Sequence, residues 1–232
     1  MILNKKIIAL VPARGGSKGI KLKNLKKIKS KTLVEITSNF IDKLKLVDLK
    51  VLNSENHKIL KIGKKLKFMN ILRPKSLSGD NVADYPVIKF SLNELKKKKL
   101  HFDYLIYLPP TTPTRKIKHL KDALKIVIKK KAFGAWSVTK IDKKYHPLKI
   151  LLNEKGFIKL NSRLGKNVIN RQSLSDIYIR NGVFYIFSIR HLNKFKTIYL
   201  KNLILSETKY EISNIDNIED LKNARKIFNK FK

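Results

Sequence analysis

A short apolar run at residues 7–11 leads directly into a loop rich in glycine and basic residues, and this combination restricts the fold most strongly. The run, IIALV, has the length and composition of a buried strand, and Pro12 closes it. The loop then contains Gly15, Gly16 and Gly19. Glycines allow backbone N–H groups to turn toward a ligand with no Cβ in the way. A strand that ends in such a loop predicts a phosphate-binding site.

The loop does not have the spacing of the common phosphate-binding motifs. A Walker A loop places four residues between two glycines and then Gly-Lys-Ser/Thr, an order that residues 13–25 lack. The dinucleotide pattern G-x-G-x-x-G also fails, because Gly15 and Gly16 are adjacent. Arg14 and Lys18 still place full positive charges beside the glycine amides. The alternative interpretation is an ordinary surface loop, which a chain this rich in lysine produces by chance.

Strand-like and helix-like runs alternate along the rest of the chain, which predicts an α/β fold with a mainly parallel sheet covered on both faces. The length of 232 residues fits one such domain. Strands are expected at residues 7–11, 48–52, 67–72, 101–108, 134–139, 149–152, 157–160, 197–200 and 209–212, and after Gly182. Helices are expected at residues 32–46, 53–65, 85–99, 116–130, 188–193 and 214–230. The loose pattern of residues 140–175 indicates an irregular insertion with a hairpin.

The formal net charge of +36 raises the question of a nucleic-acid partner. The 53 basic residues comprise 45 lysines and only 8 arginines, and the lysines are spread along the whole chain. Nucleic-acid-binding proteins favour arginine, whose planar fork pairs with phosphates and base edges. We therefore interpret the charge mainly as the amino-acid usage of an AT-rich genome. In either case the field attracts anionic small molecules.

Several absences limit the classes of protein. The chain has no cysteine, so neither a disulfide framework nor a thiolate metal site is expected. Residues 1–6 lack the apolar core of a signal peptide, and no run reaches the ~18 apolar residues of a membrane span. None of the five histidines has metal-ligand spacing. The expectation is a soluble cytoplasmic protein without a membrane partner.

The loop has a longer signature than its glycines. Residues 12–24, PARGGSKGIKLKN, match the pattern P-A-R-G/S-G-S-K-x-[IL]-P-x-K-N in register, with Lys21 at the usual proline. In this respect the chain resembles the acylneuraminate cytidylyltransferases, the CMP-sialic acid synthetases. The match is more specific than a pair of glycines, because ten positions agree in order.

Later stretches carry the same resemblance. Residues 108–115 match L-Q-P-T-S-P-L-R, with Pro109 in place of glutamine. Residues 171–186 match R-Q-D-L-P-x-x-Y-x-x-N-G-A-I-Y-I, with serine at positions 173 and 175. Residues 214–220 match D-I-D-[ST]-x-x-D in part, with Asn214 in place of the first aspartate. Weaker matches to Ser-Thr-Asp and to Arg-Pro fall at residues 53–55 and 73–74. Together these matches cover nearly the whole chain.

The resemblance implies a Rossmann-like nucleotidyltransferase, a three-layer α/β/α domain over residues 1–232. Residues 140–175 correspond to a small projecting segment that pairs two subunits, so it implies a homodimer. The implied reaction transfers CMP from CTP to the anomeric hydroxyl of a nine-carbon 2-keto sugar acid and releases pyrophosphate. Such an activity serves cell-surface polysaccharide biosynthesis.

The resemblance also implies roles for individual residues. The cations expected to stabilise the phosphates during catalysis are Arg14, Lys18 and Lys23. The residues expected to bind CTP are Ala13, Gly15, Gly16, Ser17, Asn24, Arg73, Ser78 and Asp80. The residues expected to bind the sugar acid are Thr111, Thr112, Arg171, Gln172, Tyr178, Asn181 and Tyr185.

Mg²⁺ is the expected cofactor, because it prefers one or two carboxylates together with phosphate oxygens and water. Asp216 is its expected ligand, and Asn214, a weaker candidate for a second ligand, takes the place of the first aspartate of the family motif. An amide oxygen can ligate but carries no charge, so the sequence predicts weaker metal binding, with one Mg²⁺ rather than two.

Three alternatives remain open from the sequence. The acceptor can be a related acid of the pseudaminic, legionaminic or Kdo type, because only a few polar contacts distinguish these sugars. A basic nucleic-acid-binding protein on an α/β scaffold is a second, less favoured possibility. An inactive relative used for binding is a third, and Pro109 and Asn214 are the residues that favour it.

Overall fold

A seven-stranded sheet with the strand order β11-β7-β10-β6-β1-β4-β5 runs through the computed structural model, which describes residues 4–230. Strands β1, β4, β5 and β6 are parallel to one another, and β11 is parallel to β7, whereas β10 runs antiparallel to β6 and β7. The prediction of a mainly parallel sheet is therefore confirmed. The strands are β1 (Ile7–Pro12), β4 (Leu49–Ser54), β5 (Met69–Leu72), β6 (Tyr104–Tyr107), β7 (Gly134–Ile141), β10 (Ile177–Ser188) and β11 (Leu203–Glu207).

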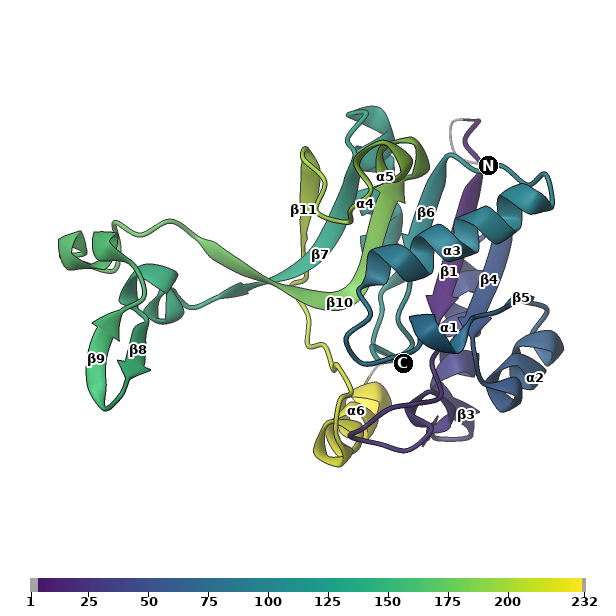
Figure 1. The fold of residues 1–232 in the computed structure, drawn as a ribbon, viewed down its shortest axis with the longest axis horizontal. Helices are drawn as coiled ribbons and strands as arrows, with labels where there is room; N and C mark the ends of the chain where they lie inside the picture. Colours follow the sequence, from purple (N-terminus) through teal and green to yellow (C-terminus); the bar gives the residue numbers. More distant parts are fainter. Residues whose placement is uncertain (1–3, 231–232) are drawn as a thin grey trace.

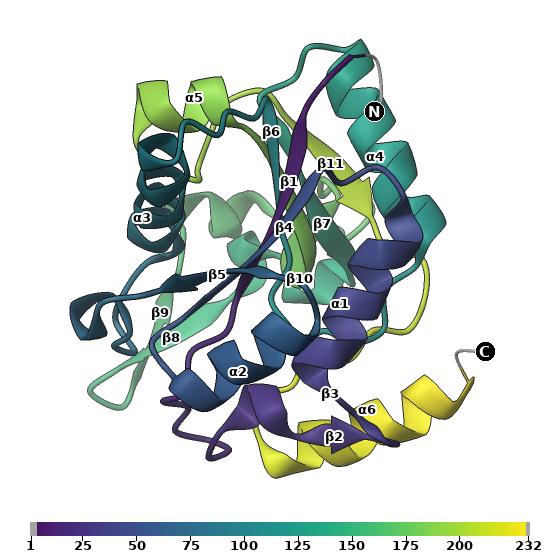
Figure 2. The same ribbon diagram turned by 90° about the vertical axis from the view of Figure 1, so that its right-hand side faces the viewer.

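Helices cover both faces of the sheet and give the molecule three layers (Figures 1 and 2). One face carries α1 (Leu33–Leu44), α2 (His57–Lys65) and α4 (Ile117–Lys129), and the other carries α3 (Asp84–Lys97) and α5 (Ile189–Phe195). Alternate residues of β1 enter the two cores, as the period of a strand requires. Ile7, Ala9 and Val11 pack toward α1 and α4, while Ile8 and Leu10 pack toward α3.

The C-terminal helix α6 (Ile218–Lys230) lies beside the first loop of the chain rather than on the sheet (Figure 2). It packs on the short strand β2 (Lys27–Ile28), which pairs with β3 (Lys31–Thr32), through a small apolar cluster that includes Ile28 and Leu221. A Cβ built on Gly19 would come within 2.2 Å of the carbonyl oxygen of Asp216, so the two segments are in direct contact. This packing brings residues from opposite ends of the sequence to one place.

An arm formed by residues 142–176 leaves the sheet after β7 and returns in β10, and it projects far from the three layers (Figure 1). It contains the predicted hairpin, with β8 (Leu151–Glu154) and β9 (Phe157–Leu160) joined by a turn whose Gly156 has a φ of +90°. Phe157 and Ile158 are each 78% exposed, and Ile169 is 94% exposed. The arm thus presents large apolar side chains to solvent.

Two predictions about the elements are wrong. Asn53 and Ser54 do not begin a helix but end β4, where they pair with β5, and Asn56 caps α2 instead. No strand forms at residues 197–200 or 209–212 within the described part of the chain; the edge strand is β11, which lies between them. Ile198 and Leu200 are buried in irregular chain against the α5 core, so their alternation imitates a strand. None of the helices described in residues 4–230 is long and apolar enough to cross a membrane.

Candidate functional site

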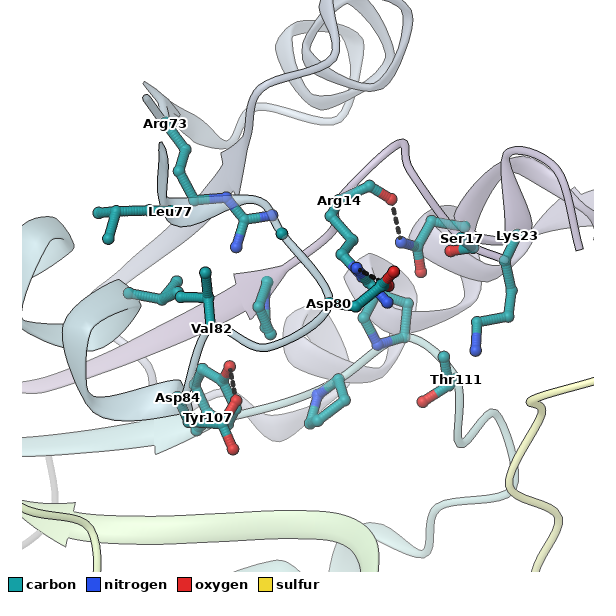
Figure 3. Close-up of a pocket in the computed structure, with 16 residues that line it drawn as sticks. Arg14, Ser17, Lys23, Arg73, Leu77, Asp80, Val82, Asp84, Tyr107 and Thr111 are labelled. Atoms are coloured by element: carbon teal, nitrogen blue, oxygen red, sulfur yellow. Dashed lines mark hydrogen bonds and ion pairs between the residues drawn. The ribbon is translucent and has the colours of Figure 1, made fainter. Parts of the chain in front are cut away.

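A cavity of about 260 Å³ opens at the carboxyl ends of β1 and β6, where open α/β sheets bind their ligands (Figure 3). Its wall includes seven residues that the sequence assigned to substrate binding or catalysis: Arg14, Ser17, Lys23, Asn24, Arg73, Asp80 and Thr111. Ala13, Gly15, Gly16, Lys18 and Ser78 belong to the same two loops but do not line this cavity. From the first loop, the cavity is therefore lined by residues with polar side chains and not by the glycines Gly15 and Gly16.

The loop after β1 is held in place by buried polar contacts. The amide of Ala13 donates to the carbonyl of Asn53, and Asn24 donates through Nδ2 to the carbonyl of Arg14 at 2.8 Å. Asn24 is buried, and its side-chain oxygen has no hydrogen-bond partner among the described residues. A buried acceptor without a partner is costly unless something completes it. Asn24 therefore both fixes the loop and retains an unused acceptor at the cavity wall.

Two of the expected phosphate-binding cations are paired with one carboxylate. Arg14 donates through Nη1 to Asp80 at 2.5 Å (Figure 3), and the ammonium of Lys18 lies 3.1 Å from the other oxygen of Asp80. Hydrogen bonds from Arg14 and Lys18 lower the pKa of Asp80 below its ordinary value. The side chain of Asp80 is 35% exposed, so this contact is open to exchange with an incoming anion.

A second carboxylate, which the sequence analysis did not assign to the site, occupies the glycine amides. Glu55 accepts from the amide of Gly15 at 2.6 Å and from that of Gly16 at 3.4 Å, and its other oxygen accepts from Arg73 at 3.2 Å. Burial by itself raises the pKa of Glu55, but hydrogen bonds from its own backbone and from Gly15, with the charge of Arg73, lower it overall. The partial match to Ser-Thr-Asp at residues 53–55 was the available signal for an acidic residue here.

Lys23, the third expected cation, contacts the expected metal ligand. Its ammonium lies 2.9 Å from one oxygen of Asp216 and is largely buried, whereas Asp216 is largely exposed. Asn214 accepts a hydrogen bond from the hydroxyl of Thr112 at 3.3 Å, and the amide of Ile215 donates to the carbonyl of Thr111. These contacts bring the expected metal residues beside the cavity.

The donors near Asp216 fit a metal ion only in part. Within the described residues, no three His, Cys, Asp or Glu side chains gather as a protein-only metal centre would require. Asp216 uses one carboxylate oxygen toward Lys23, and Asn214 adds one amide oxygen. Mg²⁺ commonly binds through one or two carboxylates with substrate phosphates completing its shell. The residues present therefore suit an ion shared with phosphates.

The base of the cavity was predicted only in part, because Tyr185 was expected to bind the sugar acid but Tyr107, Asp84 and Trp136 were not assigned to the site. Tyr107, at the end of β6, donates to Asp84 at the start of α3 (Figure 3), and burial together with this carboxylate raises the pKa of Tyr107 well above its ordinary value. Tyr185 packs against Tyr107 with ring centroids 6.3 Å apart, and Trp136 packs against Tyr185 at 5.9 Å. The three residues are paired across β6, β10 and β7, which gives a continuous aromatic row.

The residues expected to bind the sugar acid lie in three different places. Thr111 lines the cavity, and Tyr185 borders it through Tyr107. Asn181 is buried, with its amide donating to Thr139 and Thr208, so within this chain it is engaged with the fold. Arg171 and Gln172 are exposed on the arm, where Arg171 pairs with Asp142, and Tyr178 is exposed at the start of β10. The chain thus separates the arm residues from its own cavity.

Pro109 stands where the resemblance expects a glutamine side chain. It lines the cavity, and its carbonyl accepts from the buried guanidinium of Arg115, which also donates to the carbonyl of Val183 at 2.6 Å. This contact ties the loop after β6 to β10. Pro109 supplies a fixed apolar wall at a position that carries no side-chain hydrogen-bonding group.

A basic loop, at the carboxyl ends of parallel strands and beside a carboxylate suited to a phosphate-bound ion, defines a nucleotide-binding α/β enzyme. Two solved structures illustrate the fold that this chain shares. The CMP:2-keto-3-deoxy-manno-octonic acid synthetase complexed with CTP superposes with a TM-score of 0.72 at 13% identity, over 98% of this chain and 100% of that chain. A 4-diphosphocytidyl-2C-methyl-D-erythritol synthase superposes with a TM-score of 0.67 at 15% identity, over 97% and 99%. At such identities the likeness shows the fold alone.

A model of the cytidylyltransferase family matches residues 8–230, and the chain therefore belongs to this family of nucleotidyltransferases. A pseudaminic acid cytidylyltransferase of Campylobacter jejuni is 25% identical over 96% of each chain. The post-translational flagellin modification protein B of Campylobacter coli is 27% identical over 84% of this chain and 83% of that one. An N-acylneuraminate cytidylyltransferase of Escherichia coli O18:K1:H7 is 28% identical, but the match covers 53% of this chain and only 29% of that protein.

Proposed function

We propose that this cytidylyltransferase transfers CMP from CTP to the anomeric hydroxyl of a 2-keto sugar acid and releases pyrophosphate. The observation that carries the proposal is that Arg14 and Lys23 line one cavity at the carboxyl end of β1, and that Lys18 pairs with Asp80 in the wall of the same cavity. Family membership and the names of the relatives, which act on N-acylneuraminic and pseudaminic acids, support a sugar acid as acceptor. A nine-carbon acid of the sialic or pseudaminic type is the acceptor that we favour.

The cations account for the chemistry of the nucleotide. In the transfer, the acceptor oxygen forms a bond to the α-phosphorus while the bond to the pyrophosphate oxygen breaks, so negative charge grows on the leaving group. The β- and γ-phosphates displace the carboxylate of Asp80 from Arg14 and Lys18, and these two cations then hold the phosphates. Lys23 stabilises charge at the α-phosphate. Asn24, with its unused side-chain oxygen, accepts from a ribose hydroxyl or the cytosine amino group.

Mg²⁺ fits this scheme as an ion shared between Asp216 and the phosphates, and when bound it supplies further positive charge to the leaving group. The side-chain oxygen of Asn214 accepts a hydrogen bond from Thr112 and provides an uncharged metal-ligating oxygen on the same side. Asn214 carries no charge, and the carboxylate of Asp220 already accepts from the amides of Asp216 and Asn217, so we favour a single ion at Asp216.

The acceptor lies beside the aromatic row in our proposal. Tyr107 lines the cavity, Tyr185 and Trp136 continue the row from it, and Thr111 adds a hydroxyl at the cavity wall. Arg171 and Gln172 are exposed on the arm and do not line this cavity. We propose that the arm of a second subunit brings them there, so the active enzyme is a homodimer. Because CTP is an intracellular nucleotide, the reaction belongs in the cytoplasm.

One assay tests the proposal directly. Purified protein is incubated with CTP, MgCl₂ and one of N-acetylneuraminic, pseudaminic, legionaminic or Kdo acid, and pyrophosphate release is measured, with ATP, GTP and UTP as nucleotide controls. We expect release with CTP and with one or two of the acids. Lys18→Ala and Arg14→Ala are expected to remove turnover while the circular dichroism spectrum is retained. Lys26→Met, which changes an exposed lysine of the next turn, is the control and is expected to keep turnover.

The net charge of +36 makes nucleic acid the competing partner. That alternative predicts strong, salt-dependent binding to any polyanion with no dependence on CTP. Pyrophosphate release that is absent with every acid, together with tight binding of mixed-sequence DNA, would contradict the enzyme proposal.

A further inference from the structure

Glu55 joins three parts of the site that are far apart in sequence. It lies between β4 and α2, and its two carboxylate oxygens face different partners. Oε1 accepts from the amides of Gly15 and Gly16 at 2.6 and 3.4 Å, and Oε2 accepts from Arg73 at 3.2 Å. One side chain therefore links the glycine turn of the first loop to an arginine in the wall of the cavity.

The burial of this ion pair makes it a fixed part of the site. The side chain of Arg73 is 4% exposed and that of Glu55 is 16% exposed, whereas Lys18, which pairs with Asp80, is 85% exposed. Among the described residues, Glu55 is the ion-pair partner of Arg73, and the Nε of Arg73 is buried without a hydrogen bond. A buried cation that loses its anion is left uncompensated. An incoming anion can replace Asp80 beside its cations at a small cost in free energy, but it cannot replace Glu55 beside Arg73 at so small a cost.

The same carboxylate determines which groups of the glycine turn are available. Both amides that an anion would use already donate to Glu55, and the space beside Gly15 is filled by Asn56 at 2.6 Å from a built Cβ. A phosphate at these amides would meet the carboxylate charge at close range. Arg14 and Lys23, by contrast, line the cavity, and Lys18 pairs with Asp80 in its wall.

We propose that Glu55 is a positioning residue for CTP: it fixes the guanidinium of Arg73 in the cavity wall and closes the turn at Gly15 and Gly16. The triphosphate is then held by the side chains of Arg14, Lys18 and Lys23, and not by those two amides. This inference rests on the proposed function, because it concerns how that substrate is held. Glu55 touches neither substrate and acts through Arg73 and the turn.

Isothermal titration calorimetry with CTP and MgCl₂ tests the inference on the full-length protein. Glu55→Gln keeps an acceptor for Gly15 but removes the charge that orients Arg73, so the Kd for CTP is expected to rise about tenfold. The KM for the sugar acid is expected to stay within about twofold of wild type. Glu94→Gln, which removes a partly exposed carboxylate paired with Lys97 on α3, is the matched control and leaves both values unchanged.

A double-mutant cycle separates positioning from general destabilisation. If Glu55 acts through Arg73, then Glu55→Gln combined with Arg73→Met binds CTP no more weakly than Arg73→Met alone. Glu55→Asp retains the charge and is expected to bind CTP within about threefold of wild type. It also serves as the test if the glutamine variant fails to fold, because a more than tenfold loss in a folded Glu55→Asp protein is inconsistent with a role for the charge.

Two results would overturn the inference. If a folded Glu55→Gln protein binds CTP as tightly as wild type, the charge of Glu55 does not position Arg73 for CTP. Glu55→Ala that binds CTP more tightly shows that the carboxylate masks amides which bind phosphate. A wild-type protein that binds no CTP contradicts the proposed function instead, so the two failures are distinguishable.

Discussion

At the scale of single residues, each cation proposed to hold phosphate is matched by a carboxylate of the chain itself. Asp80 pairs with Arg14 and Lys18, and Asp216 pairs with Lys23. In a protein with 53 basic and 17 acidic residues, such pairing is not a product of abundance. The carboxylates hold the cations in place in the free protein, and the exposed pairs can exchange for phosphate oxygens.

Replacing Asp80 by asparagine should strengthen CTP binding. The substitution removes the anion that the triphosphate must displace from Arg14 and Lys18. Because exposed ion pairs are weak, we expect the Kd for CTP to fall by about two- to tenfold. Calorimetry gives the value, and Asp122→Asn, which breaks an exposed pair with Lys118 on α4, is the control. A rise in Kd would mean that Asp80 contributes directly to binding CTP or its metal.

Restoring the family's aspartate at Asn214 should reduce the Mg²⁺ requirement. A carboxylate in the place of the amide adds a charge beside Asp216, and Thr112 can still donate to it. We expect the Mg²⁺ concentration for half-maximal pyrophosphate release to fall severalfold. Asn217→Asp, three residues away at the start of α6, controls for the added charge because its side chain already accepts from Asp220. An unchanged Mg²⁺ dependence in the Asn214→Asp protein would show that position 214 is not a metal site.

The sequence predicted the residues of the site that belong to one local motif. Arg14, Ser17, Lys23 and Asn24 lie within eleven positions of one another, and the structure gathers all four around one cavity. Glu55 and the Tyr107–Asp84 pair were missed because their partners are 40 and 23 residues away in the chain. Such contacts depend on which strands become neighbours, and a pattern within one segment does not contain that information.

At the scale of elements, the contact between the first loop and α2 depends on the absence of one Cβ. A Cβ on Gly15 would lie 2.6 Å from the side chain of Asn56, which caps α2, whereas a Cβ on Gly16 would meet nothing within 4 Å. Gly15→Ala must therefore move either the loop or the helix cap. Overpacking of this kind should lower the melting temperature by roughly 2–12 °C.

Gly16→Ala is the matched control for this prediction, since it adds the same methyl group one residue away. Differential scanning fluorimetry compares the two variants with wild type, and we expect the melting temperature of Gly16→Ala to stay within about 2 °C. Equal melting temperatures for both variants would contradict the packing argument.

Most of the elements were predictable from their periodicity, and the exceptions have physical reasons. The apolar runs of β1, β6 and β7 and the helical spacing of α1, α3 and α4 are local patterns, and each appears in the structure. The strand at β11 was missed because it is an edge strand with Leu205 49% exposed, so it lacks a clean inward face. The end of β4 was mispredicted because its last residues are polar although they are buried, and Asn53 donates a hydrogen bond to Ser91 in the core.

At the scale of the whole molecule, the arm should set the oligomeric state. Its tip exposes Phe157 and Ile158, and a contact with a second subunit would bury both. We expect the wild-type protein to sediment at twice its mass of 26.9 kDa. The double variant Phe157→Asp, Ile158→Asp is expected to sediment as a monomer that still binds CTP but has lost pyrophosphate release.

Ile126→Asp controls for the added charge, because Ile126 is 41% exposed on α4, away from the arm. Its sedimentation should match that of wild type. A wild-type protein that remains monomeric at assay concentration and is fully active would contradict the role of the arm.

The two ends of the arm leave the sheet as neighbours, since Ile141 at the end of β7 pairs with Ile177 at the start of β10. The registers of the seven strands therefore do not depend on what is inserted between these two positions. Changes in the length or sequence of residues 142–176 therefore leave the strand pairing around the cavity intact. If the arm reaches the acceptor site of a second subunit, as we propose, acceptor choice and subunit pairing can change through this one insertion while the sheet stays the same.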